Sequence, residues 1–192
     1  MRNIYSASKQ PDALTKGECE AIVQLHQQAF DMPAEDIIGY LKERTYVDLL
    51  YEKKRGKLVG TVGIQWFISA DIVIVYVGNA VIDKNVQSKG LLTYLILRAV
   101  CKASLKYPFK RKLLLGFATS PKAYAYFTKY KYSWPKPFEV MPQDIYEVIG
   151  KYLSNHCEGH FSTHEHGYII IPREVSVKAK NKNQALKRFQ ES

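Results

Sequence analysis

The sequence predicts a mixed α/β fold, with a central twisted sheet of parallel and antiparallel strands flanked by helices on both faces. Strand-like runs rich in Val, Ile, Leu and Tyr gather before residue 84, and strand and helix patterns alternate after it. A chain of 192 residues is long enough to bury a substantial core within one domain. We expect that domain to span residues 1–172, followed by a basic tail at 173–192 that is disordered or a short helix.

The first half of the chain is expected to form one strand, two helices and a hairpin. Thr15 and Glu18 have the spacing of a capping box, which marks the start of the first helix. Two β-rich runs separated by Lys-Arg-Gly-Lys predict the hairpin. In order, these elements are a strand at 2–7, helices at 15–30 and after Pro33, and strands on either side of a turn at 54–57.

The second half is expected to open on a central strand from Asp71 to Asp83, because its nearly unbroken β-branched run is typical of burial on both faces. Within that strand, Gly78 and Asn79 predict a bulge or a close backbone approach. The further expected elements are a helix at 91–107, a strand at 112–120, helices opening at Pro121 and Gln143, a polar loop at 156–166 and a strand at 167–172.

Positive charge is concentrated in one part of the chain. The net charge is +10, yet twelve Lys or Arg residues and no acidic residue lie between Lys84 and Phe138. Such asymmetry favours a polyanionic partner, either a phosphorylated cofactor, nucleic acid or an anionic membrane surface. Three widely spaced cysteines indicate reduced thiols, and no run reaches the roughly 18 apolar residues of a membrane span. With no signal-peptide pattern at the start either, we expect a cytoplasmic protein without a transmembrane segment.

The turn from Gln87 to Leu92 reads Gln-Ser-Lys-Gly-Leu-Leu and joins the central strand to the next helix. The start of a helix exposes backbone N–H groups and a partial positive charge, so it can bind phosphate. Gly90 would let a phosphate approach the backbone, and Lys89 adds a full charge. Taken alone, the pattern also fits an ordinary turn.

The order of these features resembles the GNAT superfamily of acetyl-coenzyme A-dependent N-acetyltransferases. The family turn reads Gln/Arg-x-x-Gly-x-Gly/Ala, which is similar to residues 87–92. The family's next strand and its Asn-x-x-Ala-x-x-x-Tyr-x-x-x-Gly-Phe helix are similar to residues 113–132. In that helix pattern the named positions fall on Ser120, Ala123, Phe127, Lys131 and Tyr132. The likeness covers residues 48–132 best.

The resemblance implies acetyl-CoA as co-substrate and direct attack by an amine in a ternary complex. It places the pantetheine arm beside the end of the central strand, where a backbone N–H of Ala80 or Val81 would polarise the thioester carbonyl. Ser120 would hydrogen-bond the pantetheine. The implied cofactor-binding residues are Ala80, Val81, Ile82, Gln87, Ser88, Lys89, Gly90, Leu91, Leu92 and Ser120.

Two positions depart from the family pattern. Leu92 replaces a small residue, and its side chain either crowds the phosphate or points into the core. Phe127 occupies the position of the Tyr that protonates the leaving thiolate, and a phenyl ring has no proton to give. Tyr126 is our choice of general acid, with Tyr124 and Tyr130 as alternatives; the same residues also fit an aromatic core face.

The general base is left unassigned. The central strand has no carboxylate between Asp71 and Asp83, and its polar side chains are Tyr76 and Asn79, either of which could orient an amine or water. A base is needed only if the acceptor arrives protonated.

A histidine-rich stretch near the end of the chain has two interpretations. The residues His156, Cys157, His160, His164 and His166 have N and S ligands that zinc accepts, but not the paired spacing of known zinc sites. We therefore expect a pH-sensitive or substrate-side loop and no metal.

Two other functions remain open. A GNAT-fold protein that binds acyl-CoA or a partner without catalysis would explain Leu92 and Phe127. A basic adaptor for nucleic acid or a membrane surface would explain the charge, although no pattern for sequence-specific nucleic-acid binding is present. For the leading hypothesis the acceptor is a small-molecule or peptide amine, and the oligomeric state is open.

Overall fold

The computed structural model describes residues 3–69, 71–87, 89–116, 140–156, 162–163 and 169–170. The chain divides into two compact units, and the described residues up to 116 belong to the first. The second unit includes helix α5 (Gln143–His156) and a small sheet of β6 (Ser162–Thr163) and β7 (Ile169–Ile170). The expected helix at Pro121 and the boundary at residue 172 lie outside the described residues.

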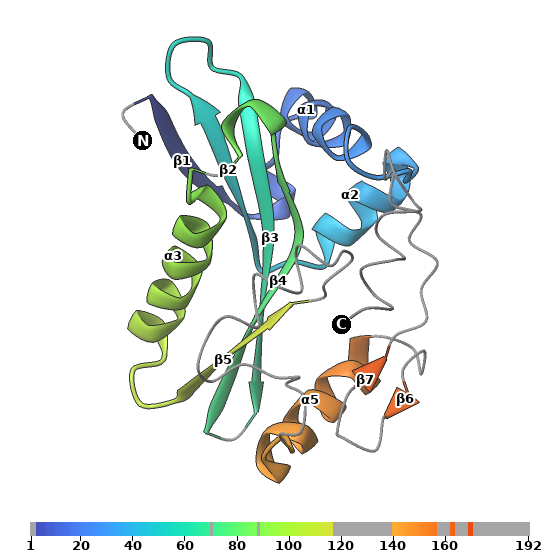
Figure 1. Ribbon diagram of the computed structural model, residues 1–192, viewed down its shortest axis with the longest axis vertical. Coiled ribbons are helices and arrows are strands. Elements are labelled where there is room, and N and C mark those ends of the chain that lie inside the picture. Colours follow the sequence, from blue (N-terminus) through green and yellow to red (C-terminus); the bar gives the residue numbers. More distant parts are fainter. Residues whose placement is uncertain are drawn as a thin grey trace, which may run out of the picture. The chain divides into compact units, whose positions relative to one another are not determined.

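The first unit is built on a mixed five-stranded sheet in the order β1-β2-β3-β4-β5 (Figure 1). The pairs β1/β2, β2/β3 and β3/β4 are antiparallel, and β5 runs parallel to β4. The strands are β1 (Ile4–Lys9), β2 (Tyr46–Glu52), β3 (Leu58–Ser69), β4 (Ile72–Ile82) and β5 (Arg111–Gly116). The mixed α/β class is therefore confirmed.

Helices cover both faces of this sheet, with α1 (Lys16–Gln27) and α2 (Ala34–Lys42) on one face and α3 (Leu91–Lys106) on the other (Figure 1). Short 3-10 helices, η1 (Pro11–Ala13) and η2 (Lys84–Val86), precede α1 and α3. The capping box of α1 is confirmed, because Thr15 Oγ1 accepts from the Glu18 N–H and Glu18 accepts from the Thr15 N–H. No helix among the described residues is long and apolar enough to cross a membrane.

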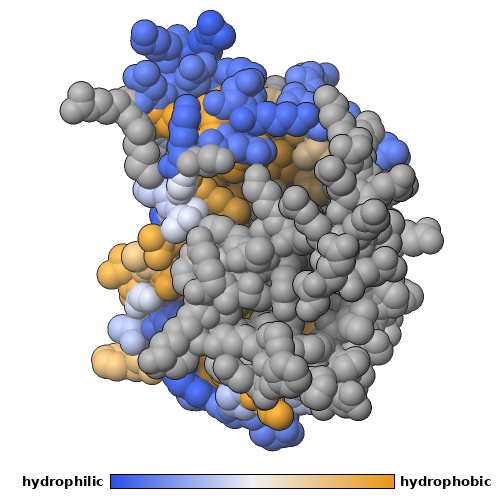
Figure 2. Space-filling model, in the orientation of Figure 1, coloured by the Kyte–Doolittle hydropathy of each residue, from blue (hydrophilic) through white to orange (hydrophobic). Residues whose placement is uncertain are grey.

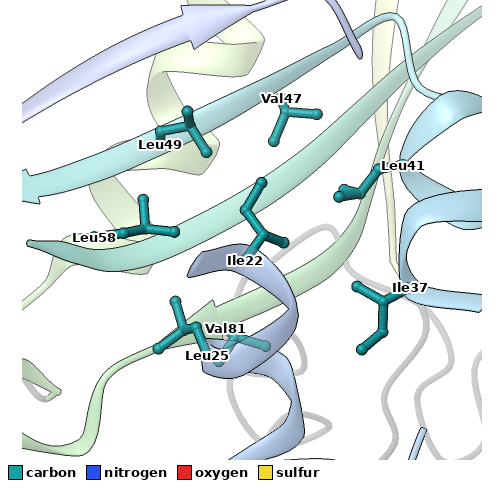
Figure 3. Packing of buried hydrophobic residues seen from close by; sticks show 8 residues of the cluster. All are labelled: Ile22, Leu25, Ile37, Leu41, Val47, Leu49, Leu58 and Val81. Atoms are coloured by element: carbon teal, nitrogen blue, oxygen red, sulfur yellow. The ribbon is translucent and has the colours of Figure 1, made fainter. Parts of the chain in front are cut away.

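The core on the α1 and α2 face comes from both helices and three strands (Figure 3). Residues three or four apart on a helix share one side, and alternate residues of a strand share one face. The helical and strand residues therefore meet in a single cluster of Ile22, Leu25, Ile37, Leu41, Val47, Leu49, Leu58 and Val81. On the opposite face, α3 buries Leu95, Ile96, Ala99 and Ala103, where two alanines allow close approach to the sheet.

The expected elements differ from the structure mainly at their ends. α1 ends at Gln27 rather than near residue 30, and the first strand runs two residues later than expected. The expected polar loop at 156–166 contains strand β6, which pairs with β7. A two-residue strand carries no sequence period, so pairing with a distant segment decides it.

His26 gives the fold a testable pH dependence. This residue lies on α1 and its side chain is buried. Its Nε2 atom has no hydrogen-bond partner in the part of the chain that the structure describes. Burial lowers the pKa of His26 from 6.5 to about 4.

Because the folded pKa lies below the unfolded one, the unfolded chain binds the proton first as pH falls. We expect the His26 contribution to be fully present above pH 6.5 and to be lost between pH 6.5 and 4, by about 3 kcal/mol. The measurement is urea unfolding across this range for the wild type and His26→Leu. The free energy of unfolding of the variant should not show this fall between pH 6.5 and 4. Wild-type and variant curves that fall in parallel with pH would contradict the prediction.

Candidate functional site

The end of β4 contains the expected bulge. Thr61 of β3 pairs with Val81, and Gly63 pairs with Gly78. The single residue between them on β3 therefore faces two residues of β4, Asn79 and Ala80. Asn79 has a φ of 50°, a left-handed conformation that asparagine adopts more readily than most residues.

Arg44, which follows α2, holds this bulge from the α1 and α2 side of the sheet. Its Nε and Nη2 donate to the side-chain oxygen of Asn79 at 3.3 and 3.1 Å. Its Nη1 donates to the side-chain oxygen of Gln65 at 3.0 Å. The Arg44 side chain is only 7% exposed. Among the described residues, the one carboxylate that pairs with it is that of Glu43, whose Oε2 lies 3.9 Å from Arg44 Nη1.

Two facing glycines make room for this arrangement. The Arg44 guanidinium lies 4.8 Å from the ring centroid of Tyr76, which is itself buried. A β-carbon on Gly78 would lie 2.7 Å from the Tyr76 hydroxyl oxygen, and one on Gly63 would lie 3.0 Å from Cγ of Arg44. The glycines are thus required by a close side-chain approach, and the guanidinium places a positive charge beside the bulge.

Beyond the bulge, β4 extends past its parallel partner. The ladder with β5 covers Ile72 to Val77, while β4 continues to Ile82. Within the described ranges, residues 78–82 have a neighbouring strand only on the β3 side. An edge that is unpaired within these ranges can accept an extended ligand as an added strand.

The turn that follows is fixed to the end of β4. The Gln87 side chain donates to the Ile82 carbonyl at 2.8 Å. The Asp83 carboxylate accepts from the Asn85 N–H at 2.9 Å and pairs with Lys57 at 2.9 Å. These hydrogen bonds, the one from Asn85 first, hold the pKa of Asp83 below its usual range despite burial. The carboxylate therefore stays ionised and keeps the turn in place.

α3 begins without a side-chain cap. Gly90 occupies the cap position with a φ of 71° and provides no hydrogen bond to the first N–H groups of the helix. A β-carbon at Gly90 would have no neighbour within 4 Å. Lys89 is exposed beside it. Backbone N–H groups that have no partner within the helix, together with the Lys89 cation, suit an anion.

The predicted site residues are only partly covered by these observations. Ala80, Val81 and Ile82 lie at the end of β4, beyond the ladder with β5, and the turn residues from Gln87 to Leu92, apart from Ser88, lie at the start of α3. Leu91 is buried and Leu92 half-buried. Ser88, Ser120, Tyr124, Tyr126 and Phe127 lie outside the described residues.

The histidine-rich stretch is also largely outside the described residues, apart from the backbone of His156 and of β6. Among the described side chains, no three His, Cys, Asp or Glu residues are grouped closely enough to hold a metal ion. Sequence reasoning missed Arg44 altogether, because an arginine after a helix usually lies in solvent and its partner Asn79 is 35 residues away.

Comparisons with known proteins give structural matches only. No family model matches the sequence, and no curated protein is significantly similar to it. An acetyltransferase from Trypanosoma brucei superposes with a TM-score of 0.53 and 13% identity, covering 73% of this chain and 99% of its own. An aminoglycoside acetyltransferase from an uncultured soil metagenomic sample, in complex with sisomicin, gives 0.52 and 14%, covering 73% and 95%.

A predicted acetyltransferase with acetyl-CoA from Clostridium acetobutylicum gives a TM-score of 0.50 and 9% identity, covering 72% of this chain and 96% of its own. Identities this low establish a common fold and nothing finer. The protein has the fold of the GNAT acetyltransferases.

Proposed function

We propose that the protein transfers an acetyl group from acetyl-CoA to an amine by direct attack in a ternary complex. The observation that carries this proposal is the edge of β4 that is unpaired within the described ranges and leads to the start of α3, which has no side-chain cap. An extended arm that ends in a pyrophosphate needs both features, side by side, in that order along the chain.

In this proposal the backbone of residues 87–92 holds the pyrophosphate and Lys89 adds charge attraction. Ala80, Val81 and Ile82 pair with the pantetheine arm, and an N–H of Ala80 or Val81 donates to the thioester carbonyl. Acetyl-CoA supplies the activated acetyl group. Ser120 as a further ligand of the arm, and Tyr126 or Tyr124 as the acid for the leaving thiolate, complete the proposed set.

The positive charge of Arg44 limits which acceptor amine fits the proposed site. Its guanidinium lies beside the bulge, and β4 carries no carboxylate there to hold a protonated amine. A nearby cation favours the neutral form of an amine, which is the form that attacks. We therefore propose a small-molecule or peptide amine of low positive charge, delivered unprotonated, which removes the need for a strong general base.

Calorimetry with CoA tests the cofactor site through a matched pair of glycines. Gly90 and Gly56 both have positive φ values, 71° and 61°, and open space around a β-carbon. Alanine causes the same backbone strain at both positions, but only residue 90 lies at the proposed phosphate site. We expect Gly90→Ala to weaken CoA binding by about tenfold, a change of about 1.4 kcal/mol, and Gly56→Ala to leave it unchanged.

No binding of CoA by the wild type at high micromolar concentration would overturn the proposal. If CoA binds while thiol release over a panel of amines stays at background, the protein is an acyl-CoA-binding protein without catalysis. Turnover that disappears in Tyr126→Phe would assign the general acid.

A further inference from the structure

The outer face of α3 carries an apolar stripe that continues into the loop before β5. We call Tyr94, Leu97, Cys101, Leu105 and Phe109 the α3 stripe. Their spacing of three or four residues returns the helical members to one side of the helix. Leu97 is 58% exposed, Leu105 84% and Phe109 99%. Figure 2 shows hydrophobic residues gathered at the left edge of the molecule, where α3 lies in Figure 1.

Cations surround the end of this stripe. Residues 84–116 contain eight Lys or Arg residues and no acidic residue. Four of them adjoin Leu105 and Phe109 in the chain, namely Lys106, Lys110, Arg111 and Lys112. Lys106 extends over the Trp66 ring, and Lys112 donates to the Tyr107 carbonyl at 2.6 Å. Asp71, which pairs with Arg111 at 2.8 Å, offsets only one of these charges.

We infer that the α3 stripe docks on an anionic membrane surface, with Leu105 and Phe109 entering the headgroup region and the lysines near lipid phosphates. A second copy of the chain would bring two strongly cationic faces together. Nucleic acid would satisfy the cations but leave Leu97 and Leu105 without apolar partners. An anionic bilayer satisfies the charges and the apolar side chains together.

This inference is independent of the proposed acetyl transfer. Gly90 and Leu105 lie at opposite ends of α3, a helix of 16 residues and so about 24 Å long. Docking through the Leu105 end therefore leaves the proposed phosphate site open. A protein bound at the membrane in this way could still take up a ligand at the start of the helix.

Vesicle co-sedimentation of the full chain tests the inference. We expect binding to phosphatidylcholine vesicles that contain about 30 mol% phosphatidylserine, weak binding to phosphatidylcholine alone, and loss of binding as NaCl rises to about 0.5 M. The double variant Leu105→Ser/Phe109→Ser should bind the anionic vesicles at least about tenfold more weakly, because each lost insertion is worth roughly that factor. Both side chains are exposed, so far-ultraviolet circular dichroism should be unchanged.

Val140→Ser is the matched control, since Val140 is 76% exposed and lies outside the stripe. It should bind the vesicles as the wild type does. Absence of vesicle binding by the wild type at low salt would overturn the inference, as would undiminished binding by the double variant. If the wild type is a dimer and the double variant is a monomer, the α3 stripe instead binds a second copy of the chain.

Discussion

Asp48→Asn is expected to lower the free energy of unfolding by about 3 kcal/mol. Asp48 lies on β2 and is fully buried between the sheet and α3. Ser8 donates to its Oδ1 atom, and Lys102 Nζ lies 3.4 Å from the same atom. Arg98 donates to the Ser8 hydroxyl at 3.1 Å, so it reaches the carboxylate only through Ser8. An amide at residue 48 would leave Lys102 without the negative charge of its buried partner.

The measurement is denaturant unfolding of the wild type, Asp48→Asn and a matched control. Asp71→Asn breaks the ion pair with Arg111, in which both side chains are more than half exposed, at 55% and 64%. Exposed pairs contribute little, so this control should change stability by less than about 0.5 kcal/mol. Adding Lys102→Met to Asp48→Asn should recover part of the loss, because it removes a cation that has lost its partner. Equal effects of Asp48→Asn and Asp71→Asn would contradict the prediction.

Local sequence signals predicted the parts of the fold that local chemistry determines. Thr15 and Glu18 form their capping box within one turn of chain, so their spacing was sufficient. Gly78 and Asn79 marked the bulge, because few other residues tolerate a left-handed backbone or a side chain lying across it. The start of α3 was likewise visible in a glycine between two apolar runs.

Partners that are distant in sequence were not predictable. Asp48 reads as an ordinary polar residue in an alternating strand, and Lys102 reads as the solvent side of a helix, yet they meet across 54 residues of chain. Arg44 is the same case in the site. Its role depends on two glycines on neighbouring strands, which leave the space that its side chain fills. Such a contact cannot be predicted from sequence spacing, because the register of the strands in the sheet creates it.

Arg44→Met is expected to lower the free energy of unfolding by about 3 kcal/mol and to loosen the bulge of β4. Methionine fills a similar space, so packing is largely kept, but the side-chain oxygens of Asn79 and Gln65 lose their buried donors. A hydrogen bond from a charged donor contributes about 1.5–3 kcal/mol, and part of this is lost at each of these two half-buried oxygens. Asn79 would also lose the contact that supports its left-handed backbone.

A second substitution separates the bulge from general packing. Asn79→Gly removes the acceptor that Arg44 bonded and adopts positive φ without strain, so adding it to Arg44→Met should recover about 1–2 kcal/mol. Glu43→Gln is the control for charge alone, because Glu43 is 63% exposed and 3.9 Å from the guanidinium; it should change stability by less than about 0.5 kcal/mol. Additive effects of Arg44→Met and Asn79→Gly would show that the two side chains act independently. A coupling energy above about 1 kcal/mol would mean that Arg44 and Asn79 act together to hold the bulge of β4, next to the proposed thioester site.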